Sequence, residues 1–213
     1  MAAMLNSPLF WLWGVPIALY ALFWLWYTPL SGPMTRAEVA AVVADLEARG
    51  ASADRIATLR AFFEADDGRS FVMVNLIDLA KDPPALPATG PNASAQDLMD
   101  HYMQFMWPEL LRRGCHPVFV GRSAGASLDL AGIEGAERWG QAALMRYRSR
   151  RDMWAISSDP RFRDRHEYKL AALEKTIALP VTPQFFPGDL RLLLLLALLA
   201  ALGLVNGVAL PSL

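Results

Sequence analysis

The polar side chains that could do chemistry stand among apolar residues in the middle of the chain. Asn75 lies inside the run 70–79, SFVMVNLIDL, where a buried amide must find hydrogen-bond partners. Two interpretations of Asn75 are open: its amide orients a substrate carbonyl, or it bonds the backbone at a strand irregularity. Arg146 also stands in an apolar run. We expect it to point inward, where a guanidinium can bind a substrate carboxylate.

The three histidines show no spacing that suits a metal ion. His101 is either a solvated surface residue or a general base, because its intrinsic pKa suits proton transfer. Tyr102 falls on the apolar side of the same expected helix, about 100° from His101. His116 and His166 lie far apart, without an H-x-x-x-H or H-x-H pattern, so we predict no metal site. A haem held by one histidine stays open, although the sequence does not select which one.

No motif indicates a cofactor, so the cofactor is unknown. The nucleotide-binding patterns G-x-x-x-x-G-K and G-x-G-x-x-G do not occur, nor does H-E-x-x-H, and we expect neither nucleotide-dependent nor common hydrolase chemistry.

Cys115 is the single cysteine and precedes His116 in a segment expected to be extended. Extended backbone points neighbouring side chains apart. We therefore interpret Cys115 as a small buried residue rather than a nucleophile.

Residues 146–165 carry a local excess of positive charge. Seven arginines in this stretch face only three aspartates. Three interpretations are open: the arginines meet anionic lipid headgroups, Arg146 binds a substrate carboxylate, or the face is basic and solvated.

The composition separates the middle of the chain from its ends. Of 213 residues, 54% are apolar and 19% charged, with a net charge of −1. Every charged side chain lies between Arg36 and Arg191. This apolar content excludes a disordered chain, and the shortage of long apolar segments excludes a polytopic transporter. The near-neutral charge argues against nucleic acid as a partner, and one cysteine excludes an internal disulfide.

Two uncharged apolar segments lie at the ends, and we predict that each crosses a lipid bilayer. Residues 9–30 would rise about 33 Å as a helix, and tryptophans stand near both ends of this segment, as at membrane interfaces. The alternative is a cleaved signal peptide, but no basic n-region precedes the apolar run and no A-x-A site directly follows it. In residues 192–210, Gly203 and Gly207 have the small-xxx-small spacing of packed helices, and Asn206 lies beside them. An ordinary Leu/Ala anchor with this spacing by chance is the alternative.

The basic residues near these segments predict an orientation. Arg36, Arg49, Lys175 and Arg191 all lie on the side of the middle region, and neither tail contains a basic residue. By the positive-inside rule we predict an integral protein of the inner or plasma membrane with its middle region in the cytoplasm.

Between the apolar segments the pattern predicts two linking helices followed by alternating strands and helices. Thr35 and Glu38 form a capping-box pattern before the first helix, which ends at Gly50, and a second begins at Ser52. Later helices are expected at 94–113 and 149–175, the latter interrupted at Asp159-Pro160. Strands are expected at 70–79, 117–122, 142–147 and 177–181.

This order predicts an α+β fold: a ferredoxin-like β-α-β-β-α-β domain flanked by two transmembrane helices. The expected regions are an N-terminal span in 1–32, a helical linker in 33–68, the ferredoxin-like domain in 69–183 and a C-terminal span in 190–213. Helices would cover one face of the antiparallel sheet. An uncovered apolar face favours a homodimer that closes sheet on sheet.

Several segments resemble the dimeric α/β-barrel (ferredoxin-like) superfamily, in a branch that is an uncharacterised domain of unknown function. They are the strand FVMVNLIDL with Asn75, Tyr102, the Gly114 turn into PVFVG, Trp139, RYRSR (146–150), SDPRF (158–162) and AALEKT (171–176). Two departures are Tyr147-Arg148-Ser149 in place of Tyr-Pro-Ser, and Lys169 where an arginine is common. The membrane segments lie outside the resemblance.

The resemblance implies a dimer in which each protomer holds a cleft between sheet and helices. The superfamily includes cofactor-independent monooxygenases, isomerases, haem-degrading enzymes and binding proteins, so fold does not decide function. Our first hypothesis is a binder or enzyme for an apolar small molecule dissolved in the membrane. Its candidate ligand-binding residues are Asn75, Tyr102, Arg146, His101 and His166. The alternative is a non-catalytic scaffold or accessory subunit that contacts a membrane protein partner through Gly203, Asn206 and Gly207.

Overall fold

The computed structural model describes residues 8–163 and 165–209. The chain divides into two compact units: the two ends, up to residue 28 and from residue 184, form the first, and residues 29–183 form the second. The segment 33–68, expected as a separate linker, is therefore part of the second unit.

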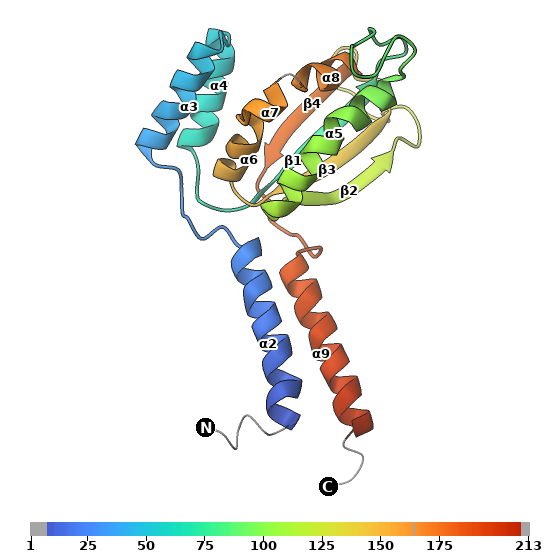
Figure 1. Ribbon diagram of the computed structural model, residues 1–213. Coiled ribbons are helices and arrows are strands. Elements are labelled where there is room, and N and C mark those ends of the chain that lie inside the picture. The colour runs from blue at the N-terminus through green and yellow to red at the C-terminus, as the bar shows by residue number, and fades with distance from the viewer. Residues whose placement is uncertain (1–7, 164, 210–213) are drawn as a thin grey trace. The chain divides into compact units, whose positions relative to one another are not determined.

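The first unit is a pair of apolar helices, α2 (Pro8–Tyr27) and α9 (Leu190–Ala209), which pack side by side and run in opposite directions (Figure 1). Arg191 joins them at one end. Its guanidinium lies 5.7 Å from the ring centre of Tyr27 and donates a hydrogen bond to Thr28 Oγ1 at 3.3 Å.

The second unit begins with two capped helices, α3 (Arg36–Ala48) and α4 (Ala53–Glu64). The Thr35 side chain accepts from the backbone N–H of Glu38 while the Glu38 carboxylate accepts from that of Thr35, which confirms the capping box. Ser52 is the N-cap of α4, and its side chain accepts a hydrogen bond from the backbone N–H of Arg55. Apolar side chains of both helices, including the fully buried Phe63, form one core with Met153 and Trp154.

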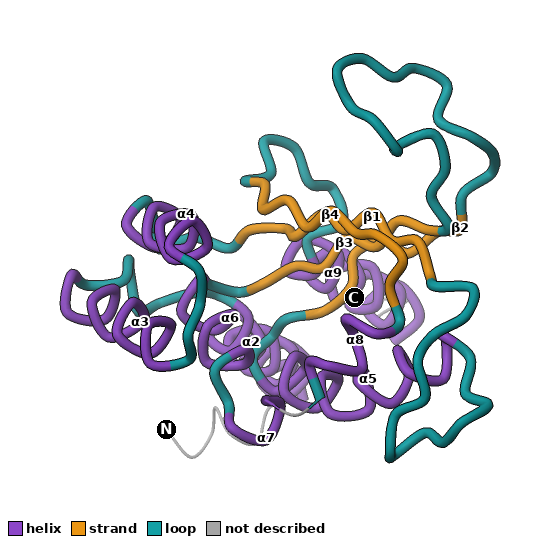
Figure 2. The backbone as a smooth tube through the Cα atoms, turned by 90° about the horizontal axis from the view of Figure 1, so that it is seen from above, coloured by secondary structure: helices purple, strands orange, loops and turns teal. Residues whose placement is uncertain are grey.

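A four-stranded antiparallel sheet follows, as predicted for the α+β class. Its strands are β1 (Phe71–Leu79), β2 (His116–Arg122), β3 (Gln141–Tyr147) and β4 (Leu173–Val181), in the order β2-β3-β1-β4. The helices on one side of it are α5 (Ala95–Arg112), α6 (Arg150–Ser157), α7 (Pro160–Arg163) and α8 (His166–Ala171) (Figure 2). From β1 onward the elements therefore follow the expected β-α-β-β-α-β series, with three short helices at the second α position.

The last helix and last strand differ from the sequence-based prediction. The helix expected to continue to Lys175 ends at Ala171, and the strand expected from Ile177 begins at Leu173. Residues 173–176 include good helix formers, but pairing with β1 across a bulge at Asp78/Leu79 overrides that propensity. Pro180 lies on an edge strand, as predicted.

Helices cover one face of the sheet, and apolar residues line the other. Phe71 stacks on Tyr147, which packs against the α5 core, and Leu79 packs against Leu98 of α5, so alternate residues of β1 face the helices. The opposite side, which we call the open face, is apolar. Its central row crosses all four strands: Phe119, Leu144, Val74 and Leu179. Phe119 and Leu179 are each 55% exposed.

Two arginines of α6 hold the segment that leads into α3. Arg151 donates to the carbonyls of Gly32 and Pro33 at 3.2 and 3.1 Å and pairs with Glu38 at 2.7 Å. Arg150 pairs with Asp66, whose other oxygen accepts from the backbone N–H of Met34. These contacts fix residues 32–38 onto the body of the second unit.

Glu109 is the centre of an ion-pair network at the end of α5. Its carboxylate pairs with Arg112 at 2.6 Å, with Arg113 and with Arg161 of α7 at 3.0 Å. Hydrogen bonds from Arg112 and Arg113 above all lower the pKa of Glu109 to about 2. Because this pKa is below the ordinary value, the network stabilises the fold above about pH 4.5 and loses its effect as the pH falls towards 2.

Replacing Glu109 by Gln is expected to lower the stability at pH 7 by about 1 to 2 kcal/mol, since two of the three arginines are largely exposed and screened. The difference in Tm between Glu109→Gln and the parent protein should shrink as the pH falls from 5 to 3. A difference that stays constant over this range would contradict the assigned role. Glu137→Gln, on an exposed loop residue, serves as the control.

Candidate functional site

Two tyrosines meet on the helix-facing side of the sheet. Tyr102 of α5 and Tyr147 of β3 are both partly buried and pack against the same core, which contains Met106 and Leu110. Burial raises the pKa of Tyr102 to about 12 and raises the pKa of Tyr147 as well. Within the described part of the chain, neither hydroxyl has a hydrogen-bond partner. Neither hydroxyl is among the buried polar atoms that lack a partner, so both still reach solvent.

Asn75 lies on this same side of the sheet, midway between Phe71 and Leu79 on β1. Its Nδ2 donates to the carbonyls of Met73 and Ala143 at 3.1 and 3.0 Å. The pairing is regular here, because the register shift between β1 and β4 lies further along, at Asp78/Leu79. The amide therefore bonds the backbone through its donors, while Oδ1 receives no donor from the described residues.

The two histidine candidates lie on different helices, His166 at the start of α8 and His101 on α5. The His166 ring lies 6.4 Å from that of Tyr102, and desolvation, followed by the charges of Lys169 and Arg55, lowers the pKa of His166. His101 is partly buried rather than solvated, with its ring 4.4 Å from that of Tyr168. The structure thus brings Tyr102 and His166 together and places His101 against Tyr168.

Lys169 is the residue that sequence reasoning missed as a site candidate. Its Nζ lies 5.9 Å from the ring centre of Tyr102. Desolvation by burial, and then the charge of Arg55, lowers the pKa of Lys169. The signal available in the sequence was its spacing, three residues after His166, which puts both on one face of a helix. We call Tyr102, Tyr147, His166 and Lys169 the tyrosine site, and Asn75 lies on the same side of the sheet.

Arg146 does not belong to the tyrosine site. It is buried, with 2% exposure, but neighbours Tyr147 on β3 and so lies on the opposite face of the sheet. Its guanidinium donates to the carbonyl of Gly114 at 2.7 Å. The expectation that Arg146 points to the same place as Asn75 is therefore corrected: this guanidinium bonds the turn before β2.

Cys115 and Ser123 offer no nucleophilic site. Cys115 is fully buried, burial raises the pKa of its thiol to about 11, and its sulfur accepts from the backbone N–H of Arg148 at 3.3 Å. The expectation that no common hydrolase pattern occurs is wrong for one motif, because residues 121–125, GRSAG, fit G-x-S-x-G. That motif requires a strand, a sharp turn and a helix, whereas Ser123 leads from β2 into a long loop and donates to the Gly125 carbonyl at 2.6 Å.

The arginine-rich stretch is used largely within the fold. Its described side chains contact the following groups: Arg146 the Gly114 carbonyl, Arg148 Asp152, Arg150 Asp66, Arg151 Glu38, Arg161 Asp159 and Glu109, and Arg165 the ring of Phe105. Most of this positive charge is therefore paired with carboxylates and does not form a separate basic face.

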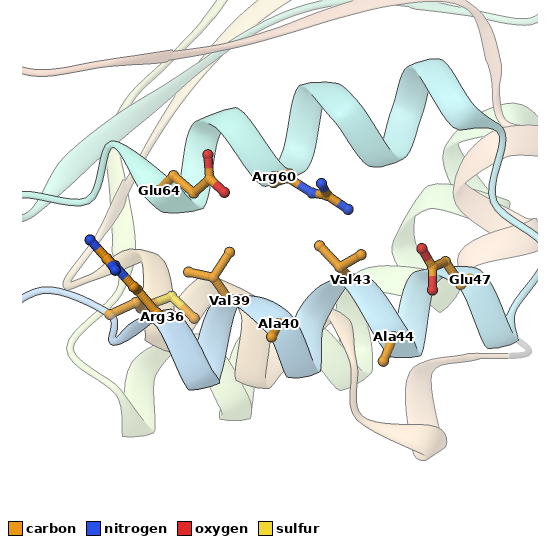
Figure 3. A pocket seen from close by; sticks show the side chains of 9 residues that line it. Arg36, Val39, Ala40, Val43, Ala44, Glu47, Arg60 and Glu64 are labelled. Atoms are coloured by element: carbon orange, nitrogen blue, oxygen red, sulfur yellow. The ribbon is translucent and has the colours of Figure 1, made fainter.

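A groove of about 600 Å³ lies elsewhere, between α3 and α4 (Figure 3). Val39, Ala40, Val43 and Ala44 supply its apolar lining, and charged side chains of both signs border it. None of the candidate residues from the sequence lines this groove. The described residues also contain no cluster of three or more His, Cys, Asp or Glu side chains that could hold a metal ion.

Within the described residues, one of the two apolar helices is long and apolar enough to cross a membrane. In α2, Phe10–Tyr27 is long and apolar enough to cross a bilayer, whereas the apolar stretch Leu190–Asn206 of α9 is shorter. Near the end of α9, Asn206 donates to the carbonyl of Leu202 in its own helix at 2.8 Å. A Cβ atom at Gly203 would meet no atom within 4 Å, and Gly207 lies one turn further along.

Comparisons with known proteins identify the fold but no family. No protein-family model matches the chain, and no curated protein matches it. Two solved structures of the RPA0582 protein of Rhodopseudomonas palustris, described as of unknown function, are similar, each with a TM-score of 0.50. The first is 22% identical over 63% of this chain and 95% of the solved one, and the second, of the methylated protein, is 24% identical over 65% and 95%. At this identity the likeness concerns the fold alone.

Proposed function

We propose that the second unit binds, or transforms, an apolar small molecule at the tyrosine site. The observation that supports this most directly is the pair of partly buried hydroxyls of Tyr102 and Tyr147, which have no partner among the described residues, on the same side of the sheet as Asn75 Oδ1. Hydroxyls that reach solvent between aromatic rings and an amide oxygen that accepts no donor from the described residues leave hydrogen-bonding capacity for a ligand. Aromatic side chains with a few polar groups are typical of sites for apolar molecules.

We propose that the protein is anchored in a membrane, the phase in which an apolar ligand dissolves. α2 and α9 would each cross a bilayer of the inner or plasma membrane, with the second unit in the cytoplasm. The length and apolar character of Phe10–Tyr27 support one crossing. The basic residues Arg36, Lys175 and Arg191, all on the side of the second unit, support the orientation.

We further propose a homodimer of the dimeric α/β-barrel type, in which two open faces pack against each other. Exposed Phe119, Ile177 and Leu179 make this face apolar. Apolar sheet faces bury themselves against a second layer.

One experiment tests ligand and dimer together: native mass spectrometry of the full chain released from mild detergent. We expect a dimer that carries a discrete ligand mass, and loss of that mass in the double variant Tyr102→Phe, Tyr147→Phe. Each lost hydrogen bond should weaken binding about tenfold. Tyr20→Phe, in α2, is the matched control and should retain the ligand. A double variant that keeps its ligand would disprove this site.

A scaffold role is the second candidate, because Gly203 leaves room on the surface of α9 for the backbone of another helix. The partner would then be a membrane protein. In the same spectra, a stoichiometric complex with another protein, no ligand mass, and loss of the complex in Gly203→Leu would favour this role over the first.

A further inference from the structure

Three basic side chains lie near one another, two of them beside Tyr102, and we call them the basic cluster: His166 and Lys169 of α8, and Arg55 of α4. His166 and Lys169 are three residues apart and share a helix face. Lys169 Nζ and the His166 ring lie 5.9 and 6.4 Å from the centre of the Tyr102 ring. Arg55 is close enough for its charge to lower the pKa of both neighbours.

The basic cluster has no counter-ion among the residues that the structure describes. Neither Lys169, His166 nor Arg55 forms an ion pair with a carboxylate there. The adjacent carboxylates, Asp54 and Glu167, are exposed and pair with none of the three. By contrast, Arg148, Arg151 and Arg161 of the same unit are all paired.

An anion bound beside Lys169 would stabilise this arrangement. A partly buried ammonium normally requires a partner, because loss of hydration disfavours the charged form. A second cation beside it adds repulsion, as the lowered pKa of Lys169 reflects. His166 and Arg55 are exposed, so the partly buried Lys169, which has no carboxylate partner among the described residues, is the group that an anionic ligand would neutralise.

We propose that the ligand of the tyrosine site ends in a carboxylate, which the basic cluster binds. The inference rests on the proposed function and adds the chemical class of the ligand: an apolar body with one anionic end. Lys169 and Arg55 supply two positive charges and charge-assisted donors. The apolar body lies against the ring of Tyr102. A ligand with a hydroxyl in place of the carboxylate leaves both cations unpaired, so it binds more weakly.

The test compares two probes with the same apolar body, 4-phenylbutyrate and 4-phenylbutan-1-ol. Calorimetric titration of the full chain in zwitterionic nanodiscs, with empty nanodiscs subtracted, gives Kd for each. We expect the acid to bind at least tenfold more tightly than the alcohol, and salt to weaken only the acid.

Variants assign the effect to the basic cluster. Lys169→Met should weaken binding of the acid about tenfold and leave the alcohol unchanged, and Lys169→Arg should restore the acid because the charge returns. Arg138→Gln, on an exposed loop residue, should change neither Kd. Thermal melting of each variant shows whether it has kept its fold.

The outcomes separate the two proposals. If both probes bind equally, the site exists and the assignment of a carboxylate is wrong. If the acid binds more tightly but Lys169→Met does not weaken it, the anion lies elsewhere and the inference also fails. If neither probe binds, the proposed function itself fails at this site.

Discussion

Replacement of Arg146 by alanine is expected to destabilise the second unit by about 3 kcal/mol, which lowers Tm by roughly 10 °C. Its side chain is 2% exposed and fills space beside the turn before β2. Alanine would leave the Gly114 carbonyl without its donor at 2.7 Å and a cavity where the long side chain lay. Melting of the full chain in mild detergent measures this change.

Arg138→Ala is the matched control and should change the free energy of unfolding by less than about 0.5 kcal/mol, because Arg138 is exposed. The comparison also separates two roles of Arg146. If Arg146→Ala keeps its Tm but loses ligand, then the guanidinium binds ligand as the sequence first indicated, and the structural role described above is wrong.

Phe63→Ala should have the largest effect of the substitutions considered, a loss of about 3 to 5 kcal/mol. Phe63 is fully buried, and its ring meets that of Trp154 edge-on at 5.8 Å. This contact joins α4 to α6. The substitution therefore removes an anchor between the α3–α4 pair and the body of the second unit.

Hydrogen exchange locates this effect. In Phe63→Ala we expect amides of α3 and α4 to exchange faster than those of β1, and the Tm to fall. Leu128→Ala, at a residue 97% exposed, is the control and should change neither quantity. An unchanged Tm in Phe63→Ala would mean that residues 33–68 add little to the stability of the second unit and act as a linker, as the sequence predicts.

Local signals explain why most elements were predictable. Thr35, Ser52, Ser94 and Ser149 each cap a helix through their own side chain, and this chemistry is visible within four residues. The start of β4 was not predictable in this way. Leu173-Glu-Lys-Thr suits a helix by propensity, and only its partner β1, about a hundred residues away, makes it a strand.

The site was predictable only in part for a similar reason. Tyr102 and His166 were chosen for their chemistry, and the packing of α5 against α8 brings them together. Lys169 gains its significance from burial and from Arg55, on a helix that precedes it by more than a hundred residues. Arg146 is adjacent to Tyr147 in sequence but on the other side of the sheet, since one residue along a strand reverses the face.

The prolines of the outer strands affect how this protein resists aggregation. Pro117 lies on β2 and Pro180 on β4, the two edges of the sheet. A proline lacks the N–H that a foreign strand would need, and β2 is further distorted by a bulge between Pro117 and Phe119. Both edges are thus poor templates for strand addition, the route by which exposed sheets grow into fibrils. Self-association of the second unit is directed away from its edges, and a new copy has to approach through the face.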